Sequence, residues 1–191
     1  MAVALPHRKT ILIQMPEPEQ YQILNSIFQN KVLDLVDGQV VALPHCNDSL
    51  TMLNNMGIDT TGCDLFDNYY EPPMFGEFRP WWWQLETAKF LSQNKYSFVT
   101  STPRTGKTLS TLMAIDHLQN NEGQRAALII APLTVAKGGE WENTIREWLP
   151  NKRVVVIHED RENELKKPAD FYLINPDGVK IVREQLEERV R

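Results

Sequence analysis

From about residue 79 onward, the chain alternates short apolar runs with longer stretches of helical periodicity. The near-continuous apolar runs predict strands at 96–101, 126–131, 153–158 and 170–174. The stretches of helical periodicity predict helices at 84–93, 107–120, 139–149 and 177–190. Apolar strands separated by helices are typical of a parallel sheet that helices cover on both faces. The pattern therefore predicts an α/β domain over residues 79–191.

The first 58 residues follow a different rhythm and predict a small α/β unit. A strand is expected at 9–14, with helices at 16–28 and 47–57. Two further apolar runs, in "KVLDLV" and "QVVAL", flank Asp37-Gly38, a pair typical of a tight hairpin turn. Residues 59–78 combine glycine, a double proline and aromatics without periodicity, so we expect a linker there.

Charge and composition narrow the classes of partner. The net charge is −5, all of it carried by residues 1–95, whereas residues 96–191 have 14 basic and 14 acidic side chains. A strongly basic nucleic-acid-binding face is therefore not expected. Cys46 and Cys63 have no metal-ligand spacing, which indicates free thiols in a reducing compartment. No run is long enough to span a bilayer, so we expect a cytoplasmic protein without a membrane partner.

The segment "STPRTGKT" (101–108) follows a predicted strand and opens a predicted helix, which is the context of a P-loop. In such a loop, backbone N–H groups and the helix N-terminus surround a diphosphate. Lys107 is expected to neutralise the β- and γ-phosphate oxygens and Thr108 to ligate Mg²⁺, and these two are the expected catalytic residues. The expected phosphate-binding residues are Ser101, Thr102, Pro103, Arg104, Thr105, Gly106, Lys107 and Thr108. A chance match at a helix start is the alternative.

The stretch from Arg79 to about Arg183 resembles the front half of the first RecA-like domain of superfamily 2 helicases. The closest resemblance is to the Swi/Snf-type helicase-like proteins of bacteriophages, in which a Pro-aromatic-x-x-Gln segment precedes the P-loop. Here that segment is "PWWWQ" (80–84). The resemblance implies that Gln84 reads an edge of adenine, so ATP with Mg²⁺ is the expected cofactor. One of the three tryptophans is expected to flank the base, and core packing is expected for at least two of them.

Two later segments resemble motifs that contact the DNA backbone in this family. "ALIIAPLTVAKGGEW" (127–141) resembles motif Ia, which implies DNA contacts through Pro132, Leu133 and Thr134, with added charge from Lys137. "FYLINPDGV" (171–179) resembles motif Ib, which implies a contact through Asn175 or Asp177. An ordinary strand-to-helix loop is the alternative for the first segment.

The acidic pair that ATP hydrolysis requires is not found in the sequence. Asn175 follows the strand at 170–174, and Asp177 lies beyond a proline, so neither is a Walker B acid. The family spacing places the pair shortly past Arg191, and a second RecA-like domain with its arginine finger is also missing. A partial sheet of four strands would leave an exposed edge, which a companion chain or self-association is expected to cover.

The combined prediction has three parts: a small α/β domain (1–58), a linker (59–78) and a partial RecA-like ATP-binding domain (79–191). We expect the N-terminal portion of a DNA helicase or DNA-dependent ATPase of phage type, which binds ATP but does not hydrolyse it alone. DNA would be bound by the complete enzyme. Two alternatives stay open: a non-catalytic module that binds replication or repair proteins, and another P-loop NTPase.

Overall fold

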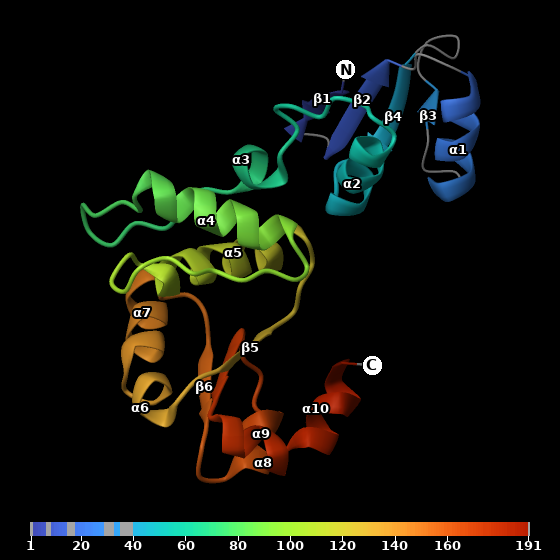
Figure 1. Cartoon of the computed structure of the whole chain (residues 1–191). Coiled ribbons are helices and arrows are strands. Elements are labelled where there is room, and N and C mark those ends of the chain that lie inside the picture. The colour runs from blue at the N-terminus through green and yellow to red at the C-terminus, as the bar shows by residue number, and fades with distance from the viewer. Residues whose placement is uncertain (1, 7–8, 15–17, 29–32, 35–39, 191) are drawn as a thin grey trace. The chain divides into compact units, whose positions relative to one another are not determined.

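A computed structural model describes residues 2–6, 9–14, 18–28, 33–34 and 40–190 (Figure 1). The chain divides into two compact units, residues 1–70 and 71–191, each of which has its own sheet. The division falls at Tyr70, inside the segment predicted to be a linker.

The first unit contains a four-stranded antiparallel sheet in the order β1-β2-β4-β3. Ile11, Ile13, Val41 and Leu43 lie on its buried face and form a core with residues of two helices and Cys63. The predicted hairpin strands pair as expected, while the turn at Asp37-Gly38 lies outside the described residues. The strands are β1 Ala2–Leu5, β2 Thr10–Gln14, β3 Leu33–Asp34 and β4 Val40–Pro44, and the helices are α1 Pro18–Phe28, α2 Asn47–Asn55 and α3 Leu65–Tyr69.

The second unit contains a three-stranded parallel sheet in the order β5-β7-β6. Its strands are β5 Ala127–Ile130, β6 Val154–Ile157 and β7 Phe171–Ile174. Its helices are α4 Trp82–Gln93, α5 Lys107–Asn121, α6 Leu133–Ala136, α7 Glu140–Trp148, α8 Arg161–Lys166, α9 Pro176–Ile181 and α10 Arg183–Val190. The single helix predicted at 177–190 is thus two helices that meet at buried Val182.

Helices cover both faces of this sheet, because alternate residues of a strand point to opposite sides. On the central strand β7, Phe171 and Leu173 face a core that α5, α6 and α7 complete. Tyr172 and Ile174 face a second core, to which α8, α9 and α10 contribute. This arrangement confirms the predicted class, a partial RecA-like parallel sheet with helices on both faces and a small α/β unit before it.

The strand predicted at 96–101 is not formed. Tyr96 and Phe98 are 87% and 86% exposed, and no strand of the described residues pairs with this segment. Apolar alternation produces a strand only where a neighbouring strand satisfies its backbone N–H and C=O groups, and β5 is an edge of the sheet. Leu128 and Ile130 of β5 are 39% and 53% exposed, on the face that is covered over β6 and β7. The expected exposed edge is therefore present, in a sheet of three strands rather than four.

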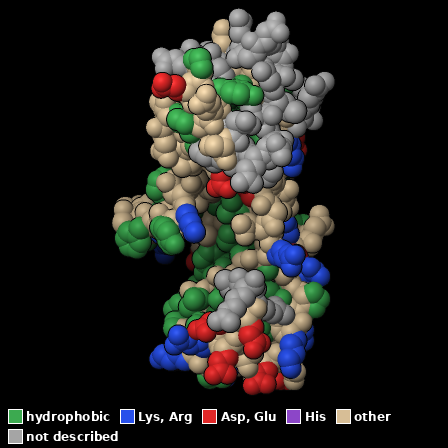
Figure 2. All heavy atoms as spheres, turned by 90° about the vertical axis from the view of Figure 1, so that its right-hand side faces the viewer, with side chains coloured by type: hydrophobic (Ala, Val, Ile, Leu, Met, Phe, Trp, Pro, Cys, Tyr) green, Lys and Arg blue, Asp and Glu red, His purple; other side chains and the backbone are tan. Residues whose placement is uncertain are grey.

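The charged side chains and the cysteines each bear on a prediction from the composition. On the face that Figure 2 shows, acidic and basic side chains are interspersed. Cys46 and Cys63 are free thiols. Within the part of the chain that the structure describes, no helix has both the length and the hydropathy needed to cross a membrane.

Candidate nucleotide-binding site

The segment predicted to be a P-loop (101–108), called the P-loop below, lies between two helices that pack against each other, α4 and α5 (Figure 1). Helix α5 begins at Lys107, and Gly106 is its N-cap with a φ of 79°. A left-handed φ of this kind suits glycine, because a Cβ would be strained there. Residues 101–104 are exposed and residues 105–108 are partly buried. The predicted phosphate-binding residues therefore lie together at the start of a helix, as the sequence indicated.

The side chain of Lys107 is folded back onto its own loop. Its Nζ donates to the carbonyl oxygen of Ser101 at 2.9 Å and to that of Thr102 at 2.7 Å. The Thr105 hydroxyl also donates to Thr102 O, at 2.9 Å. Arg104 adopts a φ of 64°, the left-handed conformation that glycine adopts without strain. The lysine thus satisfies carbonyls of the loop, and phosphate oxygens would have to replace them as its acceptors.

Gln84 is buried between the start of α4 and the P-loop backbone. Its Oε1 accepts a hydrogen bond from the Trp81 backbone N–H at 2.9 Å, as in a capping box. Its Nε2 donates to Thr105 O at 3.4 Å. A Cβ at Gly106 would lie 1.9 Å from Gln84 Nε2. Gly106 is therefore required both by its backbone conformation and by the close approach of Gln84.

The tryptophans that precede Gln84 are exposed, so the prediction that at least two of them pack in the core is wrong. Trp81, Trp82 and Trp83 are 62%, 71% and 40% exposed. The buried face of α4 is formed by Gln84 and by the residues four and eight positions later, Ala88 and Ser92. The tryptophans fall outside this helical stripe. Trp81 and Trp83 stack on each other instead, with ring centroids 4.9 Å apart.

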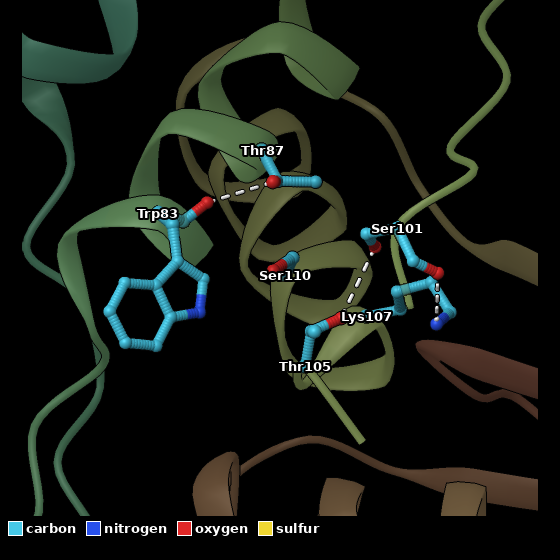
Figure 3. A pocket seen from close by; sticks show the side chains of 6 residues that line it. All are labelled: Trp83, Thr87, Ser101, Thr105, Lys107 and Ser110. Carbon is cyan, nitrogen blue, oxygen red and sulfur yellow. Dashed lines mark hydrogen bonds between the residues drawn. The ribbon is translucent and has the colours of Figure 1, made fainter. Parts of the chain in front are cut away.

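A pocket of about 310 Å³ lies beside the P-loop (Figure 3). Trp83 and Thr87 of α4 line one side of it, and Lys107 and Ser101 line the other. Thr105 and Ser110 complete the lining. Known ligand pockets range from about 300 to 1,000 Å³, so this one is at the small end of that range. Trp83, one of the exposed tryptophans, and Lys107 therefore line the same pocket.

The hydroxyl of Thr108, the expected Mg²⁺ ligand, donates a hydrogen bond to Glu140 Oε1 at 2.6 Å. Glu140 is the first residue of α7 and was not predicted from the sequence, because nothing in the chain pattern relates positions 32 residues apart. Among the described residues, no group of three or more His, Cys, Asp or Glu side chains could hold a metal ion. A cation at Thr108 would therefore need oxygens from a bound nucleotide.

The residues predicted to contact DNA lie at the carboxyl ends of the parallel strands, which we call the sheet edge. Pro132 precedes α6 beyond the end of β5, and Asn175 follows the end of β7. The two strands are parallel, and Ala131 N donates to Ile174 O at 3.0 Å, so these ends are adjacent. Pro132, Thr134 and Lys137 are exposed, whereas Leu133 and Asn175 are half-buried. Asn175 Oδ1 accepts from Gly178 N at 3.1 Å and so caps α9.

Lys137 is paired with an acidic residue from the next strand-to-helix loop. Its Nζ lies 2.9 Å from Glu159 Oε1, and both side chains are exposed. The hydrogen bond and charge of Lys137 lower the pKa of Glu159. A neighbouring carboxylate, Glu142, accepts from Gly138 N at 2.9 Å, and this bond together with the Arg146 guanidinium lowers its pKa. The only basic group of the predicted DNA-binding loop is thus engaged by an acid.

Comparisons with known proteins support the resemblance. The SNF2-related domain family matches residues 83–185, which is more than half of the chain. The SWI2/SNF2 ATPase core of Sulfolobus solfataricus, solved in complex with dsDNA, is similar over 56% of this chain and 23% of its own length, with 26% identity and a TM-score of 0.47. The UvsW helicase of bacteriophage T4 is similar over 90% of this chain and 73% of its own, with 12% identity and a TM-score of 0.48.

No curated protein matches the chain. The chain spans less than a quarter of the Sulfolobus ATPase core. The family match covers the P-loop, the Glu140 helix and the edge of the sheet that carries Pro132 and Asn175. The chain therefore belongs to the SNF2-related family.

Proposed function

We propose that the chain is the ATP-binding N-terminal portion of a Swi/Snf-like DNA helicase or DNA-dependent ATPase of phage type, acting in the cytoplasm of a host cell. The observation that carries this proposal is the pocket between Trp83 and Lys107, with the P-loop forming its wall. An aromatic ring at one end and a lysine at the other suit a ligand with a flat base and a charged phosphate tail.

At the base end, we assign the flanking ring to Trp83, because it is the tryptophan that lines the pocket. We retain Gln84 as the residue that reads adenine. Its side-chain oxygen accepts from Trp81 N and its side-chain nitrogen donates to Thr105 O, so reading a base would require it to exchange one of these partners. Gln84 would then contact the base and the backbone of the P-loop at the same time.

At the phosphate end, Lys107 would exchange the carbonyls of Ser101 and Thr102 for β- and γ-phosphate oxygens. The first N–H groups of any helix have no partner within it, and α5 begins at Lys107, inside the P-loop, as in other phosphate sites at helix N-termini. When bound with the nucleotide, Mg²⁺ would neutralise phosphate charge, and the Thr108 hydroxyl would be one of its ligands.

At the sheet edge, exposed Pro132, Thr134 and Lys137 would contact the DNA backbone, with Leu133 and Asn175 beside them. Phosphate contacts of this kind fix the position of a duplex without reading its sequence. Lys137 would supply charge once it leaves Glu159, and because both side chains of this ion pair are exposed, solvent screening leaves little energy to be lost.

We further propose that this chain does not hydrolyse ATP by itself. Asn175, an amide rather than an acid, stands directly after β7, and its side chain caps α9. A companion chain would supply the acidic pair and cover the β5 edge, where Leu128 and Ile130 are exposed. DNA-stimulated ATP turnover by the purified chain that is lost on Lys107→Ala would contradict this part of the proposal.

The assignment of Gln84 and Trp83 is tested by comparing ATP with GTP in calorimetric titrations. Gln84→Ala loosens the P-loop for any nucleotide, so the informative quantity is the ratio of the two affinities rather than either affinity alone. We expect Gln84→Ala to lower the preference for ATP over GTP. We expect Trp83→Ala to weaken both nucleotides together, because stacking on a ring is tolerant of base identity. Phe90→Ala, which removes an exposed aromatic ring of the same helix outside the pocket lining, is the matched control.

An equal loss for ATP and GTP on Gln84→Ala would show that Gln84 only supports the loop. Unchanged affinity on Trp83→Ala would remove the tryptophan from the base site.

A further inference from the structure

The bond between Thr108 and Glu140 joins the P-loop to an acidic residue from a distant part of the chain. The two residues open different helices, α5 and α7, and are 32 positions apart. Their oxygens are 2.6 Å apart, with the hydroxyl donating. In the proposed function, the Thr108 hydroxyl is a ligand of Mg²⁺. The carboxylate therefore already lies where that cation would be coordinated.

The loop before α7 holds Glu140 in this position. Gly139 has no room for a Cβ, which would lie 2.6 Å from the carbonyl oxygens of Thr134 and Val135. The next acid of the helix, Glu142, binds Gly138 N and closes the same turn. Ile145 anchors α7 in the core of the sheet. The turn before α7 and the packing of Ile145 in the core thus hold the start of α7, and with it Glu140, in place.

We propose that Glu140 is a carboxylate ligand, direct or through one water molecule, of the Mg²⁺ that enters with the nucleotide. This inference rests on the proposed function and names a residue to which neither the P-loop pattern nor the resemblance assigns a role. Mg²⁺ in nucleotide sites is bound by one or two carboxylates together with phosphate oxygens and retained waters. Thr108, Glu140 and the phosphates supply that combination.

The same carboxylate has a second consequence. Without a cation, Glu140 would face the negative charge of a triphosphate and oppose its binding. With Mg²⁺ it would become an attractive partner. Glu140 would therefore make nucleotide binding depend on Mg²⁺ more strongly than the P-loop alone does.

Glu140→Gln separates this role from a purely structural one. A glutamine oxygen still accepts a hydrogen bond from Thr108, so the tether between α5 and α7 is kept while the charge is lost. Glu147→Gln is the matched control, because Glu147 is an exposed acid of the same helix two turns further on. The measured quantity is the ratio of ATP affinities in Mg²⁺ and in EDTA. Because the ratio is taken within one protein, a fraction of unfolded molecules cancels.

We expect Glu140→Gln to lower this ratio about tenfold, the smaller of the losses that follow removal of a residue supporting a bound metal. Glu147→Gln should leave the ratio unchanged. A second readout, the affinity of Mn²⁺ for the ADP complex followed by electron paramagnetic resonance, should fall by a similar factor. A ratio equal to that of the unmutated chain would overturn the inference and leave the proposed function standing. ATP binding that does not depend on Lys107 would overturn both.

Discussion

The amide nitrogen of Gln84 lies so close to Gly106 that a methyl group on the glycine would be 1.9 Å from it. Gln84, near the start of α4, is thus in close contact with Gly106, the N-cap of α5. Since Gln84 also donates to Thr105 O, the position of the P-loop depends on the packing of the two helices.

Gly106→Ala is expected to destabilise the chain and to weaken ATP binding. A left-handed conformation costs an L-residue about 1–2 kcal/mol, and the clash with Gln84 adds to this. Gly123→Ala is the control, since Gly123 has a similar φ of 74° and no neighbouring atom within 4 Å of the added Cβ. Urea unfolding should show the larger loss at Gly106, with the excess relieved when Gln84→Ala is combined with it. Equal losses at the two glycines would refute the close contact.

Arg104→Gly is expected to stabilise the chain. Its φ of 64° is strained for arginine, and relief of about 1–2 kcal/mol exceeds the entropic cost of glycine, about 0.5–1 kcal/mol. The net gain should be about 0.5 kcal/mol in the free energy of unfolding. Arg125→Gly, at a position without positive φ, should instead be neutral or destabilising. A loss of stability at Arg104 would mean that its side chain contributes more than the strain costs.

Lys137→Ala is expected to weaken binding of the chain to duplex DNA at all sequences. Each phosphate contact contributes about one unit to the slope of log affinity against log salt, so the slope should fall by about 1. Glu159→Gln should strengthen binding, because it releases Lys137 from its ion pair. Lys166→Ala, at the far end of α8, serves as the control. An unchanged slope in Lys137→Ala would remove this loop from the DNA surface.

Asp170→Asn is expected to destabilise the sheet in a pH-dependent manner. Asp170 accepts from Arg153 N at 2.7 Å and from the Arg153 guanidinium, which lowers the pKa of Asp170 in the folded chain. A lowered folded pKa stabilises the chain fully above the unfolded pKa, and this contribution is lost as the pH falls through the folded pKa. The variant should lose about 1–2 kcal/mol at pH 7, and the loss should shrink as the pH falls through the folded pKa of Asp170.

Urea unfolding at several pH values checks the Asp170 prediction. Asp177→Asn, which removes an exposed acid paired with Lys180, should have little effect at any pH. A loss at Asp170→Asn that stays constant with pH would show that the carboxylate charge is not the cause.

Periodicity predicted the parts of the fold that depend on local pattern. The strands β5, β6 and β7 and the helices α5 and α7 lie within a residue or two of their predicted ranges, and the apolar face of α7, with Ile145 and Leu149, packs on the sheet. The prediction of a strand at 96–101 was wrong because a strand needs a neighbouring strand to pair with, and the local pattern does not encode that neighbour. The prediction that at least two of the tryptophans are buried was wrong because only one face of α4 packs in the interior. That face consists of Gln84, Ala88 and Ser92 and does not include the tryptophans.

The candidate site shows the same division. The P-loop residues are contiguous, so their order alone predicted where Lys107 and Thr108 lie. The contact between Gln84 and Gly106 requires the packing of α4 on α5, and the bond between Thr108 and Glu140 requires the packing of α5 and α7. Interactions between side chains that the fold brings together cannot be read from spacing.

The central claim is that this chain binds ATP through its P-loop, and titration of Lys107→Ala with Mg²⁺-ATP tests it most directly. Lys95→Ala removes the same charge from the same α4–α5 connection and is the matched control. We predict a loss of at least about tenfold in affinity for Lys107→Ala, equivalent to about 1.4 kcal/mol, and no change for Lys95→Ala. Equal affinities of Lys107→Ala and the unmutated chain for ATP would contradict the account.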